Sequence, residues 1–182
     1  MQTLKEELHD VQTHGAAAGD VMDIVTGLVP PDPLYDVRHA REKVAVAMQK
    51  SYDVFFDASA RGLALRERLL VALYACSLSE SSALSAHYRQ ALHAQGVEQA
   101  VLAAIETDAL ASLNDTRLTV ILGFARKLIV KPVEGDAEEI KRLRDAGVAT
   151  PDIVTLAQLI AFLSYQIRVA AGLLAMKELA SK

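Results

Sequence analysis

The sequence predicts an all-α protein of seven to eight helices, and three observations support this prediction. Apolar residues recur with a period near 3.6 along almost the whole chain, whereas alternating apolar and polar runs are scarce. Apolar residues form 52% of the 182, enough for a core, while aromatic residues form only 5%. This composition, rich in Ala and Leu, favours helices over a β-sandwich. We expect one domain over residues 1–182, with its core in about residues 20–176.

The charge and cysteine content exclude several classes of protein. Lys and Arg number 19 against 23 Asp and Glu, so the net charge is −4, whereas nucleic-acid binding needs a positive surface. The only cysteine, Cys76, can form neither an intramolecular disulfide nor a cysteine-rich zinc site. No secretory signal is visible at the N-terminus, and polar residues interrupt the most apolar segment, residues 156–176. We therefore expect a soluble, cytoplasmic protein that binds neither nucleic acid nor membrane.

Helix start and stop signals place the elements of the first half. Three prolines between residues 30 and 33 end a first short helix and force an extended connection, because each ring restricts the backbone around it. The long helix that follows is expected to bury a face made of Val37, Ala40, Val44, Met48 and Phe55. A loop at Gly62 precedes a strongly apolar helix. The predicted helices of this half span about residues 20–28, 35–56 and 65–78.

Capping signals place the elements of the second half. Ser77 and Glu80 have capping-box spacing, which predicts a turn around them, and a second such pair opens the helix after Asp136. Asp115 can cap a further helix, and Thr150 before Pro151 begins the last one. The predicted helices of this half span about residues 79–96, 97–106, 115 onward, 136–147, and 150 to the C-terminus.

The last predicted helix is apolar on nearly all sides, which is unusual for a helix at the surface of a small protein. Its expected core face consists of Ile153, Leu156, Ile160, Leu163, Ile167 and Leu174. Four further apolar residues lie on other faces, namely Leu159, Phe162, Val169 and Leu173. Burial against a second subunit would cover these faces. We therefore expect a homo-oligomer.

Two stretches of the chain are the most informative for function. The first is Leu65-Arg-Glu-Arg-Leu-Leu-Val-Ala-Leu, followed after a turn by Ala86-His87-Tyr88. The second comprises Leu122-Gly-Phe-Ala-Arg-Lys-Leu, Leu143-Arg-Asp-Ala-Gly-Val and residues 160–173. Together they resemble the peroxidase-related branch of the alkylhydroperoxidase D / carboxymuconolactone decarboxylase family, over about residues 20–176. The resemblance implies an all-α fold assembled as trimers, or as hexamers built from them.

The sequence departs from this family at the positions that carry its redox chemistry. Peroxidase members have a C-x-x-C-x-x-x-H motif at the start of a helix and a relay Glu on the preceding helix. If His87 is the motif histidine, the two cysteine positions fall on Glu80 and Ala83. The relay Glu then falls at about Arg68 or Leu69. Without the cysteine pair, a two-cysteine peroxidase mechanism is not expected.

His87 is the main candidate for chemistry, as a general acid or base tuned by Glu80 or Glu67. The alternative is a helix histidine that only bonds a neighbour. Cys76 could be the thiol of a one-cysteine peroxidase or a redox sensor, but its apolar surroundings favour a buried, inert cysteine.

Arg168 and Tyr165 are candidates for binding an anionic substrate, because an arginine in an apolar helix is costly unless it is paired. A structural ion pair of Arg168 with another helix or subunit is the alternative. The spacing of the histidines and carboxylates indicates no metal site, and no motif indicates a cofactor.

Three functions therefore remain open from the sequence. The first is a peroxidase-related antioxidant protein, which the missing cysteine pair opposes. The second is a cofactor-free enzyme that resembles the lactone decarboxylases and uses His87 on a small organic acid, with Arg168 as carboxylate anchor. The third is a non-catalytic oligomer that binds a ligand or serves a structural role on the same scaffold.

Overall fold

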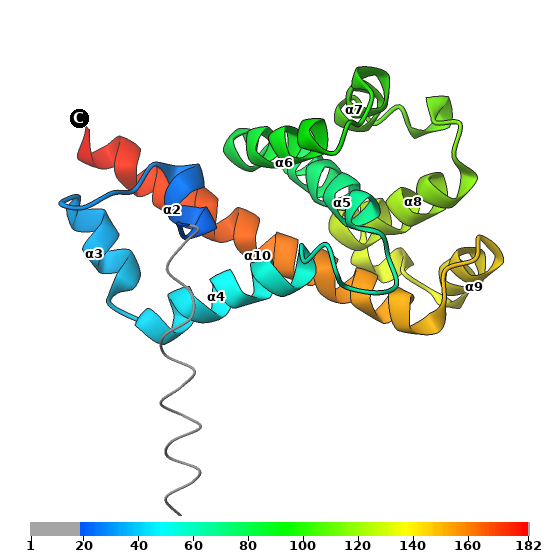
Figure 1. Ribbon diagram of the computed structural model, residues 1–182, viewed down its shortest axis with the longest axis horizontal. Helices are drawn as coiled ribbons and strands as arrows, with labels where there is room; N and C mark the ends of the chain where they lie inside the picture. Colours follow the sequence, from blue (N-terminus) through cyan, green and yellow to red (C-terminus); the bar gives the residue numbers. More distant parts are fainter. Residues whose placement is uncertain (1–18, 182) are drawn as a thin grey trace, which may run out of the picture.

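Helices build all of the regular structure in residues 19–181, the part of the chain that the computed structural model describes (Figure 1). This finding confirms the all-α prediction, although these residues form nine α-helices where seven or eight were expected. The α-helices are α2 (Val21–Thr26), α3 (Pro33–His39), α4 (Glu42–Phe55), α5 (Leu65–Leu78), α6 (Ser82–Ala94), α7 (Gln99–Glu106), α8 (Thr116–Val130), α9 (Ala137–Asp145) and α10 (Thr150–Ala180). Two 3-10 turns, η1 (Leu110–Ser112) and η2 (Pro132–Glu134), flank α8.

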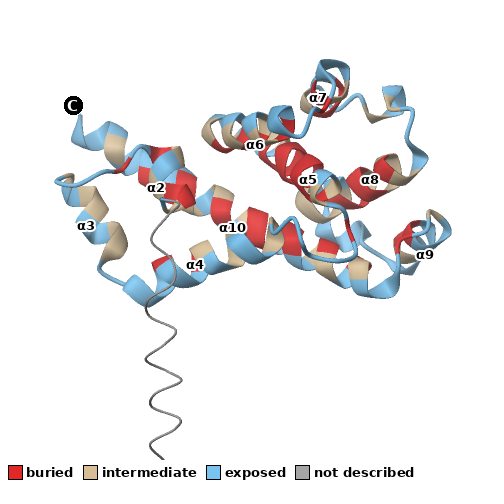
Figure 2. Ribbon diagram, in the orientation of Figure 1, coloured by how far each residue is buried: buried red, intermediate tan, exposed pale blue. Residues whose placement is uncertain are grey.

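Helix α5 lies at the centre of the bundle, with α6, α7, α8 and α10 packed around it. Every residue from Arg68 to Cys76 is buried, so the helix is covered on all sides (Figure 2). Its apolar sequence therefore fits a central position, since a helix without a polar face is stable only inside a larger body. The bounds predicted for this helix are those observed.

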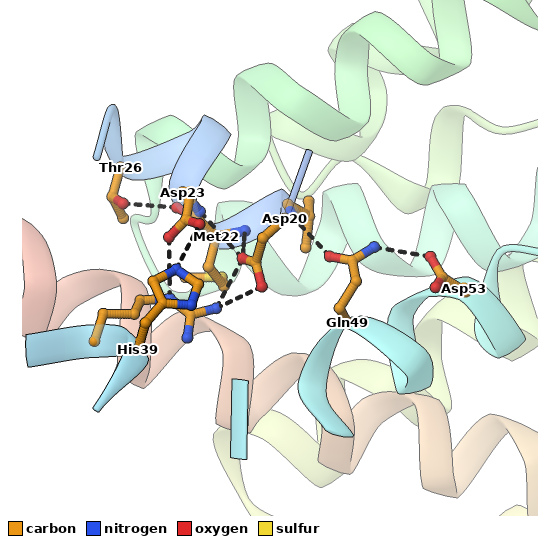
Figure 3. A network of polar contacts seen from close by, with 9 residues as sticks. Asp20, Met22, Asp23, Thr26, His39, Gln49 and Asp53 are labelled. Carbon is orange, nitrogen blue, oxygen red and sulfur yellow. Dashed lines mark hydrogen bonds and ion pairs between the residues drawn. The ribbon is translucent and has the colours of Figure 1, made fainter. Parts of the chain in front are cut away.

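The single helix predicted over residues 35–56 is wrong, because α3 ends at His39 and α4 begins at Glu42. Polar contacts hold the end of α3 against α2 instead: Arg38 Nη2 donates to Asp20 Oδ1 at 2.7 Å, and His39 Nε2 lies 2.8 Å from Asp23 Oδ2 (Figure 3). The break also changes which residues are buried. Of the predicted apolar face, Val37 and Val44 are exposed, and in α4 Ala45 packs inward beside Met48.

Two of the predicted helix caps are correct and two are not. Thr150 is the first residue of α10, with Ala149 at the cap position, so the predicted Thr150 cap is wrong. Asp115 accepts a hydrogen bond from the Leu118 N–H, and Asp136 accepts from the first amides of α9, as their positions predict. The capping box at residues 77–80 is wrong, because the Ser77 hydroxyl bonds back to the Leu73 carbonyl. Glu80 is exposed in the turn, with φ of 54°, and α6 begins two residues later.

Helix α10 runs along the bundle and contacts α2, α5 and α8 (Figure 1). Leu159, Phe162 and Leu173, expected on outer faces, are buried, whereas Leu174 from the expected core face is exposed. Near its end, the Lys177 ammonium donates to the last carbonyls of α2, at 3.0 and 2.6 Å. By length and composition α10 could also cross a membrane, with a mean hydropathy of 1.7 over 18 residues, of which 39% are buried here. Core helices of soluble proteins pass the same test.

Candidate acid/base site

A histidine and a tyrosine from two different helices meet near the end of α4. Tyr52 Oη lies 2.8 Å from His87 Nε2, which joins α4 to α6. The two rings also pack against Phe56 and Tyr88, with ring centres 4.9 to 5.7 Å apart. We call these four residues the aromatic cluster.

Local helix geometry explains how the aromatic cluster forms. Tyr52 and Phe56 are four residues apart at the end of α4, so their side chains lie on the same face. Tyr88, beside His87 on α6, is fully buried and donates a hydrogen bond of 2.6 Å to Gln166 Oε1 on α10. The cluster therefore ties α4 and α6 to α10, and it holds His87 among apolar ring faces.

Burial controls the protonation states in the aromatic cluster. It lowers the pKa of His87 below the ordinary value of 6.5, because the charged imidazolium is poorly solvated there. Burial, and then the nearby charge of Asp53, raise the pKa of Tyr52. At neutral pH the pair is therefore a neutral imidazole and a neutral phenol, and Nε2 can accept the Tyr52 proton.

The aromatic cluster opens to the surface at Tyr52. This residue and Phe56 line an open groove of about 520 Å³ together with Asp53, Val54 and Asp57. Tyr52 therefore links the groove to the imidazole. A phenol and an imidazole in contact can exchange a proton.

The carboxylates expected beside His87 lie elsewhere. Glu67 Oε1 accepts from Arg117 Nε at 2.7 Å, and Oε2 accepts from the Ala64 amide at 2.9 Å, so this side chain joins the start of α5 to α8. Glu80 points from an exposed turn. Within residues 19–181, neither carboxylate is hydrogen-bonded or ion-paired to His87, whose hydrogen-bond partner there is Tyr52.

Cys76 is buried near the end of α5. Burial raises the pKa of its thiol to about 12, so almost no thiolate is present at neutral pH. A peroxide requires both access to the sulfur and the thiolate form. The surroundings of Cys76 therefore support the interpretation of a structural cysteine.

Arg168 and Tyr165 lie on the outer side of α10. Both are exposed, and Arg168 Nη1 donates to the Ser164 carbonyl at 2.7 Å. The predicted burial of Arg168 in an apolar helix is therefore wrong, because α10 turns its other side to the core. A different arginine, Arg68 of α5, is buried, and it is one of the two positions, with Leu69, to which the resemblance assigns the relay Glu.

Sequence patterns offer little indication of three residues in or beside this site, namely Tyr52, Phe56 and Gln166. Tyr52 and Phe56 have the spacing of one helix face, but a link to His87, 35 residues away, needs the packing of α4 on α6. Gln166 interrupts an apolar run, and this was the available signal for a polar group in the core.

In the part of the chain that the structure describes, no group of three His, Cys, Asp or Glu side chains could hold a metal ion.

Fold and site together define an all-helical protein with one buried cysteine and a His–Tyr pair at a surface groove. Its fold is that of an uncharacterized peroxidase-related protein from Silicibacter sp. TM1040, with a TM-score of 0.66, 20% sequence identity, and coverage of 71% of this chain and 68% of that chain. The likeness agrees with the peroxidase-related resemblance in the sequence, and at this identity what is shared is the fold. The chain matches no protein-family model and no curated protein.

Proposed function

We propose that this protein is a cofactor-free acid/base catalyst that acts on a small organic acid through Tyr52 and His87. The observation that carries the proposal is the 2.8 Å contact between a neutral imidazole and the hydroxyl of Tyr52, a residue that lines a groove. A thiol peroxidase is the less favoured function, because the single cysteine is buried and its pKa is about 12.

The proposed chemistry is a proton transfer at carbon. The Tyr52 oxygen takes a proton from the bound acid while its own proton passes to His87 Nε2, and the electron pair of the broken C–H bond stays on the substrate. The reverse transfer returns a proton to the same or a neighbouring carbon. The oxidation state does not change, so the step needs no redox cofactor. A base with a pKa below 6.5 is unprotonated at neutral pH and ready for this role.

Hydrogen–deuterium exchange at carbon tests the proposal without knowledge of the final product. The protein is incubated in D₂O with a panel of small oxo acids and lactone acids, and deuterium uptake is followed by NMR. We expect exchange with at least one acid, reduced by about 100-fold or more in both His87→Gln and Tyr52→Phe. Tyr165→Phe, on the exposed side of α10, is the matched control and keeps the wild-type rate. Exchange that is unchanged in His87→Gln, or absent for every acid, would contradict the proposal.

A non-catalytic oligomer on the same scaffold is the second candidate function, and exposed apolar residues favour it. On α3 and α4 these are Val37, Val44, Val46 and Val54, and on α10 they include Val154, Leu174, Met176 and Leu179. Such patches often mark contacts with another protein. We propose that the chain forms a homo-oligomer, a trimer or hexamer, in the cytoplasm. Assembly without any carbon-bound exchange would favour this function over catalysis.

A further inference from the structure

A second pocket lies at the end of α4, next to the groove at Tyr52, and Val54 lines both. The Phe55 ring packs on Phe162 of α10, whereas Phe56 packs on Tyr52 and Tyr88. The pocket has a volume of about 280 Å³ and lies where the loop after α4 passes the first half of α10 (Figure 1). Its lining includes Phe55, Arg61, Leu63, Arg68, Thr155 and Gln158.

Arg68 is the unusual member of this lining. Its side chain is only 3% exposed, although guanidinium groups are seldom fully buried without a charge partner. Nη1 donates to the Phe55 carbonyl at 2.6 Å and Nη2 donates to the Asp57 carbonyl at 2.9 Å. Nε is buried and has no hydrogen-bond partner among the residues described. The buried cation therefore keeps one donor without a partner, and Arg68 also lines the pocket.

The carboxylates near Arg68 bind other groups. Asp57 attracts Arg68 from the start of the loop after α4, but both of its carboxylate oxygens accept from Ser59. Glu67 binds Arg117, and no ion pair of Arg68 is found within residues 19–181. Burial lowers the pKa of Arg68, which means that the positive charge is poorly solvated. A bound anion would supply the missing solvation.

We propose that this pocket binds the carboxylate of a small organic acid, separately from the aromatic cluster. Arg68 and Arg61 supply positive charge, and Thr155 and Gln158 supply neutral polar groups. The apolar part of the ligand lies against Phe55 and Leu63. A monoanion with an apolar body fits this mixture better than inorganic phosphate, which is fully polar and doubly charged and needs more donors.

Benzoate is a suitable probe, because it joins one carboxylate to a small apolar ring. Binding is followed in the full chain by the backbone amide signals of Thr155 and Gln158 in two-dimensional NMR and by the unfolding temperature. We expect benzoate to move these signals and to raise the unfolding temperature, and benzamide, its uncharged counterpart, to bind about tenfold more weakly or worse. Phosphate is the second comparison and is expected to have little effect.

Two variants test the site in different ways. Arg68→Met removes the charge and is expected to weaken benzoate binding about tenfold or more. Because Arg68 also holds the loop after α4, Ala60→Phe is the second variant: residue 60 is exposed and lines the pocket, so a large ring there fills it with little effect on the core. Arg66→Met, an exposed arginine one half-turn earlier on α5, is the matched control and keeps the wild-type affinity.

The failure of this proposal is distinguishable from that of the acid/base function. His87→Gln is expected to retain benzoate binding, since the pocket does not include the aromatic cluster. Three results would overturn the proposal: no benzoate binding to the wild type, binding that persists in Ala60→Phe, or binding that is lost in His87→Gln. A phosphate affinity equal to that of benzoate would also overturn it, because it would mark a general anion site.

Discussion

At the scale of single residues, the same helix bundle gives His87 and Cys76 opposite capacities for chemistry. His87 is partly buried, and Tyr52 connects it to a surface groove. Burial therefore lowers the pKa of His87 while a route to the surface remains. Cys76 is fully buried, and the same loss of solvent raises its pKa and makes it inert. Access to the surface, more than residue type, therefore separates the candidate catalytic group from the structural one.

The lowered pKa of His87 predicts a pH dependence of folding stability. Since the unfolded state binds a proton near pH 6.5 and the folded state only at lower pH, the contribution of neutral His87 is fully present above pH 6.5. It is lost as the pH falls from 6.5 through the folded-state pKa, with a slope of up to about 1.4 kcal/mol per pH unit. Urea unfolding of wild type and His87→Gln between pH 5 and 8 measures this difference.

Replacement of Tyr52 distinguishes the effect of its hydrogen bond on the pKa of His87 from the effect of burial. If Tyr52 donates to the neutral imidazole, Tyr52→Phe raises the pKa of His87 in an NMR titration, because the neutral form loses a partner. The exposed Tyr165→Phe leaves that pKa unchanged. A fall in the His87 pKa on removal of the hydroxyl would argue against this direction of donation.

The burial of Cys76 predicts a thiol that is unreactive in the folded protein. We expect labelling by a disulfide reagent at pH 8 to be slow when the protein is native and rapid after denaturation in urea, which serves as the positive control. Thiol-dependent reduction of an alkyl hydroperoxide should be negligible in wild type and in Cys76→Ser. Turnover that is real in wild type and lost in the variant would establish a one-cysteine peroxidase.

At the scale of elements, ion pairs determine where the N-terminal helices lie. Asp20 caps α2 and also binds Arg38 of α3, whose Nε lies 3.3 Å from Asp23 Oδ1. Gln49 of α4 accepts from the first amide of α2 at 2.8 Å and donates to Asp53 (Figure 3). Since α3 has no buried residue and α4 buries only Ala45 and Met48, these polar contacts contribute much of their positions relative to α2.

Removal of Arg38 tests this conclusion. Arg38→Met leaves two largely buried carboxylates without their partner, and we expect a loss of about 3 kcal/mol in the free energy of unfolding. Amide hydrogen exchange should increase first in α2 and α3. Arg41→Met, at the exposed break between α3 and α4, is the control and should change stability by less than about 0.5 kcal/mol. Equal stability of the two variants would show that the ion pairs contribute nothing.

At the scale of the whole molecule, apolar residues on α4 and α10 remain uncovered in the single chain. Light scattering at micromolar concentration is expected to show a trimer or hexamer. Leu174→Glu together with Leu179→Glu on α10 should reduce the molar mass, because charges cannot be buried in an apolar contact. Val133→Glu, 93% exposed on η2, is the control and should leave the mass unchanged. A wild-type monomer would contradict this prediction.

The success of the sequence-based predictions varies with how local the cause is. The bounds of α5 and the caps at Asp115 and Asp136 depend on neighbours within a few residues, and these predictions are confirmed. The break between α3 and α4 depends on Asp20 and Asp23, which lie 16 to 18 residues before their partners, and the prediction of one helix was wrong.

The sequence by itself determined the helical class, the absence of a cysteine pair and the candidacy of His87, because periodicity, composition and motif spacing are written along the chain. Only the tertiary structure decided which groups meet. It joined His87 to Tyr52 in place of a carboxylate, exposed Arg168, and buried Arg68 beside a pocket. The physical reason is that contacts between helices depend on how each one is rotated about its axis, and that rotation is set by the packing of the whole bundle.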